Sequence, residues 1–241
     1  MRPEPSPAAP APGIAVVYQD DALVVLHKPA GLLSVPGRGE DKQDCLSRRV
    51  QDHFPDALVV HRLDMATSGL LVMARGAAVQ RQLSAAFAQR QVHKHYIAVV
   101  HGDGRREDDG AWQTIDLPMR VDWERRPLQT IDLQHGKASV TRWRCIGFDT
   151  ATQTSRLELE PHTGRSHQLR LHLQAIGHPI VGDALYANQH PAHLAPHHGP
   201  QQKAACAAAP TAVRLLLHAD SLAFTHPVTG SPLQLHSPCP F

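Results

Sequence analysis

The chain has 241 residues, 42% of them hydrophobic and 5% aromatic, and its 24 Lys and Arg against 22 Asp and Glu give a formal net charge of +2. A chain of this length forms one large domain or two small ones and needs no disulfide or metal to hold a core together. The charge balance excludes a polybasic tail protein but permits a locally basic binding face. No apolar run reaches the roughly 18–20 residues of a membrane-spanning helix, so a soluble cytoplasmic protein is predicted.

Short hydrophobic runs separated by turn residues dominate the chain after a proline-rich start. Residues 1–13 contain five prolines and little to bury, so a disordered lead-in is predicted there and a single domain over residues 14–241. Strands are predicted at Ile14–Tyr18, Leu23–His27, Leu58–Leu63, Gly69–Ala74, Tyr96–His101, Ala138–Phe148, Arg156–Glu160, Arg214–His218 and Ser221–Thr225. Helices are predicted at Gln43–Phe54, Gly76–Arg90 and Ser166–Ile176. Strands that arrive in pairs with few helices indicate an α+β fold with a mixed, largely antiparallel sheet.

Two kinds of site receive little support. The glycine-rich motifs of nucleotide-binding loops are incomplete in this sequence, so no nucleotide cofactor is expected. A long surface loop is predicted at residues 187–210, where His190, His193, His197 and His198 stand among Ala, Pro and Gln. Ligands on such a loop lose affinity to ordering entropy, so no metal site is predicted. The four cysteines, Cys45, Cys145, Cys206 and Cys239, form no CxxC pair and are predicted to be free thiols.

Charged residues inside an otherwise apolar segment mark the strongest candidate site. The run from His61 to Met73 places Asp64 after Val59, Val60 and Leu63, so a partly buried carboxylate is predicted at the end of a strand. Such a carboxylate stays ionised when it has a cationic or hydrogen-bonding partner. Arg62, on the same face of an extended strand, and Arg165, in a glycine turn before a helix, are the candidate partners. From the residues alone, a structural Arg–Asp pair and a functional carboxylate remain equally open.

Several sequence motifs, in the order in which they occur along the chain, resemble those of the RluA family of pseudouridine synthases. They are Lys28-Pro-Ala-Gly-Leu-Leu-Ser-Val-Pro36, His61-Arg-Leu-Asp64 with Thr67-Ser-Gly69, Lys94-His-Tyr-Ile-Ala98, and Thr163-Gly-Arg-Ser-His-Gln-Leu-Arg-Leu-His172 continuing to Tyr186. Leu216 to Ala219 and His226-Pro227 resemble the family's C-terminal strands. The resemblance runs from about Ile14 to the C-terminus, and within the family it is strongest toward the dual-specificity members that act on tRNA and 23S rRNA. It implies one catalytic domain whose sheet is split by a central RNA-binding cleft and flanked by helices. With the core beginning at Ile14, no S4-type RNA-binding domain is expected.

The resemblance also implies an activity and roles for residues. Members isomerise uridine in RNA to pseudouridine without a cofactor. Asp64 matches the catalytic aspartate, as a nucleophile at C1′ or as the base that removes the 2′ proton; Arg165 matches the arginine that pairs with it. Tyr96 matches the tyrosine that stacks on uracil, although a core tyrosine on a strand is the alternative. Arg62 matches the residue that enters the RNA stack vacated by the target base, and His61, Thr67, His167, Gln168 and Arg170 complete the predicted RNA-binding set.

The implied partners are a tRNA anticodon stem-loop, with the uridine at position 32 as target, and a 23S rRNA stem-loop. No membrane or DNA partner is expected, and a monomer is predicted. Two alternatives stay open. One is a catalytically silent RNA-binding module of the same fold. The other is a metal hydrolase that uses His93, His95 and the histidines of the 187–210 loop, although neither spacing resembles a helical metal motif.

Overall fold

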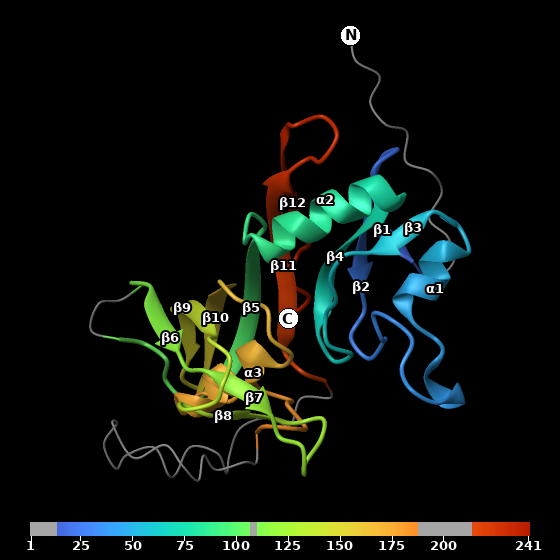
Figure 1. Ribbon diagram of the computed structural model, residues 1–241. Coiled ribbons are helices and arrows are strands. Elements are labelled where there is room, and N and C mark those ends of the chain that lie inside the picture. Colours follow the sequence, from blue (N-terminus) through green and yellow to red (C-terminus); the bar gives the residue numbers. More distant parts are fainter. Residues whose placement is uncertain (1–13, 107–109, 188–213) are drawn as a thin grey trace. The chain divides into compact units, whose positions relative to one another are not determined.

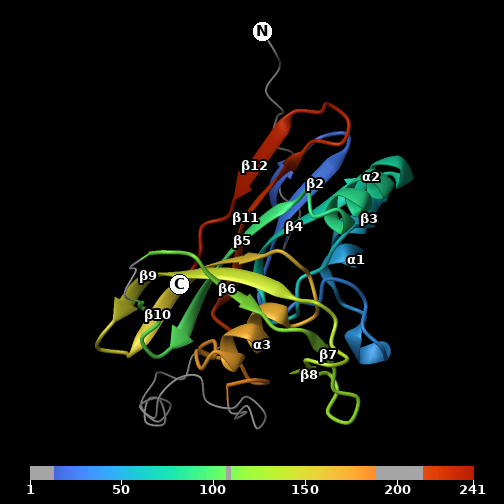
Figure 2. The same cartoon turned by 60° about the vertical axis from the view of Figure 1, so that its left-hand side comes forward.

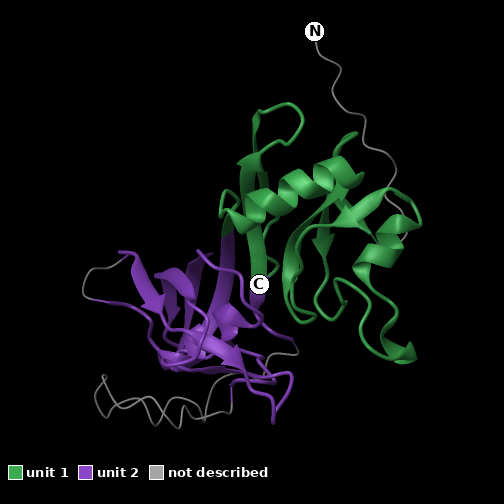
Figure 3. Cartoon of the chain, viewed as in Figure 1, with its two compact units in different colours: residues 1–94, 218–240 green, residues 95–217, 241 purple. Residues whose placement is uncertain are grey.

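The computed structural model describes residues 14–106, 110–187 and 214–241 (Figure 1). The chain divides into two compact units, one formed by residues 1–94 and 218–240 and the other by residues 95–217 and 241 (Figure 3). Each unit is described by itself below. The predicted lead-in at residues 1–13 and all but Ala187 of the predicted 187–210 loop lie outside the described residues.

The first unit is built on a sheet in which β1, β2, β4 and β11 are neighbours in that order, while β3 pairs with β4 and β12 with β11. Its strands are β1 (Ala15–Gln19), β2 (Leu23–Lys28), β3 (Ala57–Val59), β4 (Ser68–Arg75), β11 (Leu217–Thr225) and β12 (Pro232–His236). A short 3-10 turn, η1 (Glu40–Lys42), and two helices, α1 (Leu46–Gln51) and α2 (Ala77–Ala88), complete it. β11 runs parallel to β4, and the other strand pairs of this unit are antiparallel.

Helix α2 covers one face of this sheet because its apolar residues recur on one side. Val79 and Leu83 stand four residues apart and both are buried in a core that includes Leu23 of β2, Leu70 of β4 and Leu222 of β11. Figure 1 shows the helix lying across these strands. This spacing is what predicted a helix from the sequence, and the prediction is confirmed with its ends two residues or fewer away.

The second unit contains a sheet in the order β5, β10, β9, β6 and a separate hairpin of β7 and β8. The strands described there are β5 (His93–His101, which begins in the first unit), β6 (Gln113–Asp116), β7 (Met119–Val121), β8 (Gln129–Ile131), β9 (Val140–Asp149) and β10 (Thr154–Pro161). Among its described residues, the helix is α3 (Gln168–Ala175). Figure 2 shows α3 beside the β7–β8 hairpin. Met119, Leu128, Leu171 and Tyr186 form a core where the helix and the hairpin meet.

Several predicted elements need correction. The strand predicted at 58–63 ends at Val59, and residues 60–64 are irregular, so Arg62 and Asp64 do not share the face of an extended strand. In place of the two strands predicted at 214–218 and 221–225 there is one strand, β11, which begins only at Leu217. The helix predicted at 43–54 covers only Leu46–Gln51. Strands β6, β7 and β8 were not predicted, because three or four residues are too few to show an alternating pattern. β12 was not predicted either, although Leu233 and Leu235 alternate there with exposed residues.

Two further predictions concern cysteines and membrane spans. Of the four cysteines, Cys45, Cys145 and Cys239 form no disulfide, as predicted, and Cys206 lies outside the described residues. Among the helices that the structure describes, none is long and apolar enough to cross a bilayer.

Candidate active site

Asp64 lies in the irregular segment that leaves β3 and enters β4. Its side chain is half-buried, as the sequence predicted. The backbone turns directly after it, because the Thr67 N–H donates to the Asp64 carbonyl at 3.1 Å. Thr67 is buried, with 2% of its surface exposed, so burial does not favour the RNA contact predicted for it. Asp64 therefore lies at the start of a tight turn that a backbone hydrogen bond closes.

The residues on both sides of Asp64 are fixed by the segment that follows β2. The buried hydroxyl of Ser34 donates to the Leu63 carbonyl at 2.7 Å and accepts from the Leu63 N–H at 3.1 Å. On the other side, the Met65 carbonyl accepts from the Gly31 N–H at 2.8 Å and from Lys28 Nζ at 3.0 Å. Groups on either side of the carboxylate thus have partners, which limits the positions that Asp64 can take.

Lys28 is a fully buried lysine at the end of β2. Its ammonium also donates to the carbonyls of Pro29 at 2.9 Å and Leu32 at 2.7 Å, so all three of its protons have acceptors. Burial lowers the pKa of Lys28 to about 8, and the negative charge of Asp64 opposes this shift. A buried cation therefore organises the turn of Asp64 and interacts with its charge. Lys28 and Ser34 belong to the first of the motifs that resemble the family, but no function was predicted for either residue. The lysine at the end of an apolar strand could have indicated the role of Lys28.

His61 has a partner inside the first unit. The Val72 N–H donates to its Nε2 at 3.0 Å, and its ring stacks on Phe87 with centroids 4.5 Å apart. Burial, together with the nearby charge of Lys94, lowers the pKa of His61 to about 3, so the ring is neutral near pH 7. This geometry favours a structural role over the predicted RNA contact. Arg62, by contrast, is exposed.

Tyr96 lies on β5 in the second unit, half-buried and paired in register with Leu159 of β10. The same face of these strands carries the buried residues Ala98 and Leu157. The predicted strand position of Tyr96 is therefore confirmed, while its stacking on uracil stays a prediction.

Arg165 is exposed on the loop between β10 and α3, and the side chain of Gln168 holds that loop. The Arg165 N–H and the Thr163 hydroxyl both donate to Gln168 Oε1, at 3.0 and 2.8 Å, while Gln168 Nε2 donates to the Val140 carbonyl at 3.0 Å. Gln168 is only 3% exposed, so its buried contacts favour positioning of Arg165 over direct contact with RNA.

Arg170 and His167 are held by residues that follow α3. The guanidinium of Arg170 donates twice to the Asp183 carboxylate, at 2.6 and 2.8 Å, and the two side chains are 5% and 0% exposed. The Tyr186 hydroxyl lies 2.9 Å from His167 Nδ1, and His167 adopts a left-handed conformation with φ of 57° before the helix. The buried Arg170 fork favours a structural role over the predicted RNA contact, because its Nε and Nη2 already have carboxylate partners.

The candidate residues thus fall into two groups. His61, Arg62, Asp64 and Thr67 belong to the first unit, and Tyr96, Arg165, His167, Gln168 and Arg170 belong to the second. The pairing of Asp64 with Arg165, and the cleft implied by the family resemblance, stay predictions.

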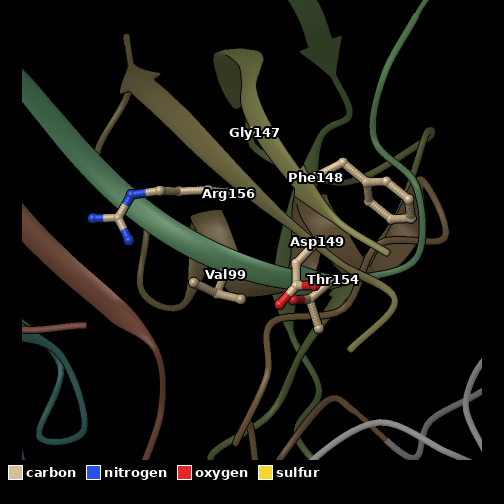
Figure 4. Close-up of a pocket in the computed structure, with 6 residues that line it drawn as sticks. All are labelled: Val99, Gly147, Phe148, Asp149, Thr154 and Arg156. Carbon is tan, nitrogen blue, oxygen red and sulfur yellow. The ribbon is translucent and has the colours of Figure 1, made fainter. Parts of the chain in front are cut away.

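A separate hollow of about 320 Å³ lies on the β5, β9 and β10 strands of the second unit. Figure 4 shows the six residues that line it, Val99, Gly147, Phe148, Asp149, Thr154 and Arg156. None of them is a candidate site residue. Within the described residues, no three His, Cys, Asp or Glu side chains gather to hold a metal ion, and His190, His193, His197 and His198 lie outside them.

Comparison with known proteins identifies the class. The model of the RNA pseudouridylate synthase family matches residues 22–175, a span that contains the nine candidate residues. The chain belongs to this family and is accordingly an isomerase that acts on RNA. The family and the α+β fold predicted from the sequence are confirmed.

Individual relatives of known name and individual solved structures are also similar to this chain. The dual-specificity RNA pseudouridine synthase RluA of Escherichia coli K12 is 41% identical over 95% of this chain and 95% of its own length. The protein of the same name from Yersinia pestis is 45% identical over 90% of this chain and 95% of its own length. The solved structure of human RNA pseudouridylate synthase domain containing 1 is 26% identical, with a TM-score of 0.70 over 98% of this chain and 87% of that one.

Proposed function

We propose that this chain isomerises uridine at position 32 in the anticodon loop of tRNAs, and a uridine in a 23S rRNA stem-loop, with Asp64 as the catalytic carboxylate. The observation that carries the proposal is the construction of the Asp64 turn. Hydrogen bonds of Lys28, Gly31 and Ser34 connect the residues beside Asp64 to the segment that follows β2. Both segments are motifs on which the resemblance to the family rests. Similarity to dual-specificity enzymes over 95% of the chain supports the substrate pair.

The reaction needs a carboxylate and no external reactant. The N1–C1′ bond of uridine breaks, the uracil turns, and a C5–C1′ bond forms; the proton on C5 is then lost and N1 gains one, so the atoms balance. Asp64 starts this either by attacking C1′ or by removing the 2′ proton. In both routes its fixed backbone reduces the entropy lost on reaching the reactive geometry.

Arg165 and Tyr96 complete the proposed machinery. A guanidinium can bind both oxygens of a carboxylate, which would orient Asp64 and favour its ionised form. The ring of Tyr96 would stack on the uracil, and its hydroxyl would lie near the C5 proton. Arg62, exposed beside Asp64 in sequence, would fill the stack that the extruded nucleotide leaves.

The test is tritium release from RNA that carries 5-tritiated uridine. The chain should release tritium from an anticodon stem-loop, and Asp64→Asn should release none while binding the RNA with unchanged affinity. Asp21→Asn, an exposed aspartate of the same unit, serves as the matched control and should behave as wild type. Tritium release by Asp64→Asn would show that Asp64 is not the catalytic carboxylate. No release by the wild type would favour the silent RNA-binding module instead.

Substrate choice, location and assembly need separate measurements. Mapping pseudouridine across total RNA from cells with and without the protein should show loss at the tRNA and 23S rRNA positions. Loss at one of them alone would reduce the proposal to a single target. We also propose that the protein acts in the cytoplasm as a monomer, which cell fractionation and light scattering at working concentration would test.

A further inference from the structure

An ion-pair cluster surrounds His95, the residue before Tyr96 on β5. Nδ1 of His95 is hydrogen-bonded to Glu158 Oε1 at 3.1 Å, and Nε2 lies 3.2 Å from Glu160 Oε1. We call His95, Glu158 and Glu160 the His95 clamp. The ring of His95 therefore bridges the carboxylates of Glu158 and Glu160, both on β10.

The same carboxylates are held from the other side by β9. Arg144 lies 2.5 Å from Glu158 Oε2, and Arg142 lies 3.1 Å from Glu160 Oε2. The two arginines stand opposite these glutamates in the antiparallel register, and both guanidiniums lie 4.8 Å from the Trp112 ring. Because each glutamate is bound on both of its oxygens, the carboxylates that receive His95 are fixed in place.

The position of the clamp matters because the β5–β10 ladder ends there. The registered pairs run from His101 with Thr154 to Tyr96 with Leu159, and Tyr96 is the last of them. His95 is the next residue along β5, and its two partners, Glu158 and Glu160, flank Leu159 on β10. The side-chain clamp thus continues the attachment of β5 to β10 one residue beyond the backbone pairing.

We propose that His95 is a positioning residue for Tyr96. The clamp fixes the strand on the face opposite the tyrosine ring, because successive side chains of a strand point to opposite faces. The inference rests on the role given to Tyr96 in the proposed function. An isolated exposed ion pair contributes little to stability, but this one lies at the end of a ladder where the chain would otherwise separate from its neighbour.

The experiment compares three variants of the full chain by tritium release and by amide hydrogen exchange. His95→Leu removes both contacts and should lower kcat roughly ten- to hundredfold with KM unchanged, because small displacements of a reacting group are costly. The Tyr96 amide should exchange faster in the same variant. His95→Arg supplies a planar fork that can reach both carboxylates, so it should restore most of kcat and the slow exchange. His93→Leu, an exposed histidine of the same strand, is the control and should match wild type.

Three results would overturn the inference: kcat of His95→Leu within twofold of wild type, an effect confined to KM, or no rescue by His95→Arg. Tyr96→Leu separates this from failure of the proposed function. If Tyr96→Leu is impaired while His95→Leu is normal, only the positioning role is wrong. If Tyr96→Leu turns over normally, the role of Tyr96 in the proposed function is wrong and the positioning role falls with it.

Discussion

Replacing Gly69 by alanine should destabilise the protein more than the same change at Gly76 or Gly147. Gly69 lies on β4 between Lys28 of β2 and Ala219 of β11, with φ of 115°. A methyl group there would overlap the carbonyl oxygen of Ala219 and lie 2.5 Å from its nitrogen. Both obstacles are backbone atoms of a paired strand, so the clash cannot be relieved by a side-chain rotation.

The magnitude follows from two terms. A residue other than glycine at such a φ costs roughly 1–3 kcal/mol, and overpacking adds about 1–3 kcal/mol. The smaller entropy of the unfolded alanine chain offsets about 0.4–1 kcal/mol of this. A net loss of about 3 kcal/mol in the free energy of unfolding is expected, a large part of the roughly 5–15 kcal/mol typical of a native protein.

Two glycines provide matched controls. Gly76 also has a positive φ, 82°, but a methyl group there meets nothing within 4 Å, so only the backbone term of about 1–3 kcal/mol applies. Gly147 has open space and no positive φ, so its alanine variant should lie within about 0.5 kcal/mol of wild type. Urea denaturation followed by far-ultraviolet circular dichroism measures all three. If Gly69→Ala costs no more than Gly76→Ala, the close approach of β4 and β11 is not what requires glycine.

Two further predictions concern buried polar groups. Because the pKa of His61 is about 3 in the folded chain against an ordinary value of 6.5, the unfolded chain binds the extra proton, and stability should fall as pH drops from 6.5 toward 3, by up to about 1.4 kcal/mol per pH unit. His61→Leu, which leaves the Val72 N–H without its acceptor, should be less stable at pH 7, and urea curves should show the difference narrowing toward pH 4; parallel pH profiles would contradict this. Arg170→Met leaves the carboxylate of Asp183 buried without its cation, so it should cost about 3–5 kcal/mol in the same assay; a cost under about 1 kcal/mol would show that the pair is dispensable.

The sequence predicted much of the fold because burial leaves a local periodic pattern. Helix α2 followed from the spacing of Val79 and Leu83, and β2 and β4 followed from apolar runs bounded by polar residues. The pattern fails where an element is short. β7 and β8 have three residues each, and their pairing is made by the hairpin, not by alternation along either strand.

The candidate site divides in the same way. Asp64 was predicted to be a functional residue because a carboxylate in an apolar segment is unusual. The order of the motifs along the chain indicated the family that the comparisons then confirmed. The roles of Gln168 and Arg170 were not predictable, because a polar side chain next to a candidate arginine looks equally suited to RNA and to a buried partner. Asp183, thirteen residues beyond Arg170, favours the buried partner for that arginine by accepting from its Nε and Nη2.

By itself, the sequence determined the family, the class of fold and the carboxylate on which the chemistry is proposed to depend. Only the tertiary structure showed that Lys28 binds the carbonyl of Met65, in the turn of Asp64, from 37 residues away along the chain, and that His95 is fixed by two glutamates of a neighbouring strand. The physical reason is that a residue's own pattern reports whether it is buried, whereas the partner that satisfies a buried polar group depends on which distant segments fold beside it.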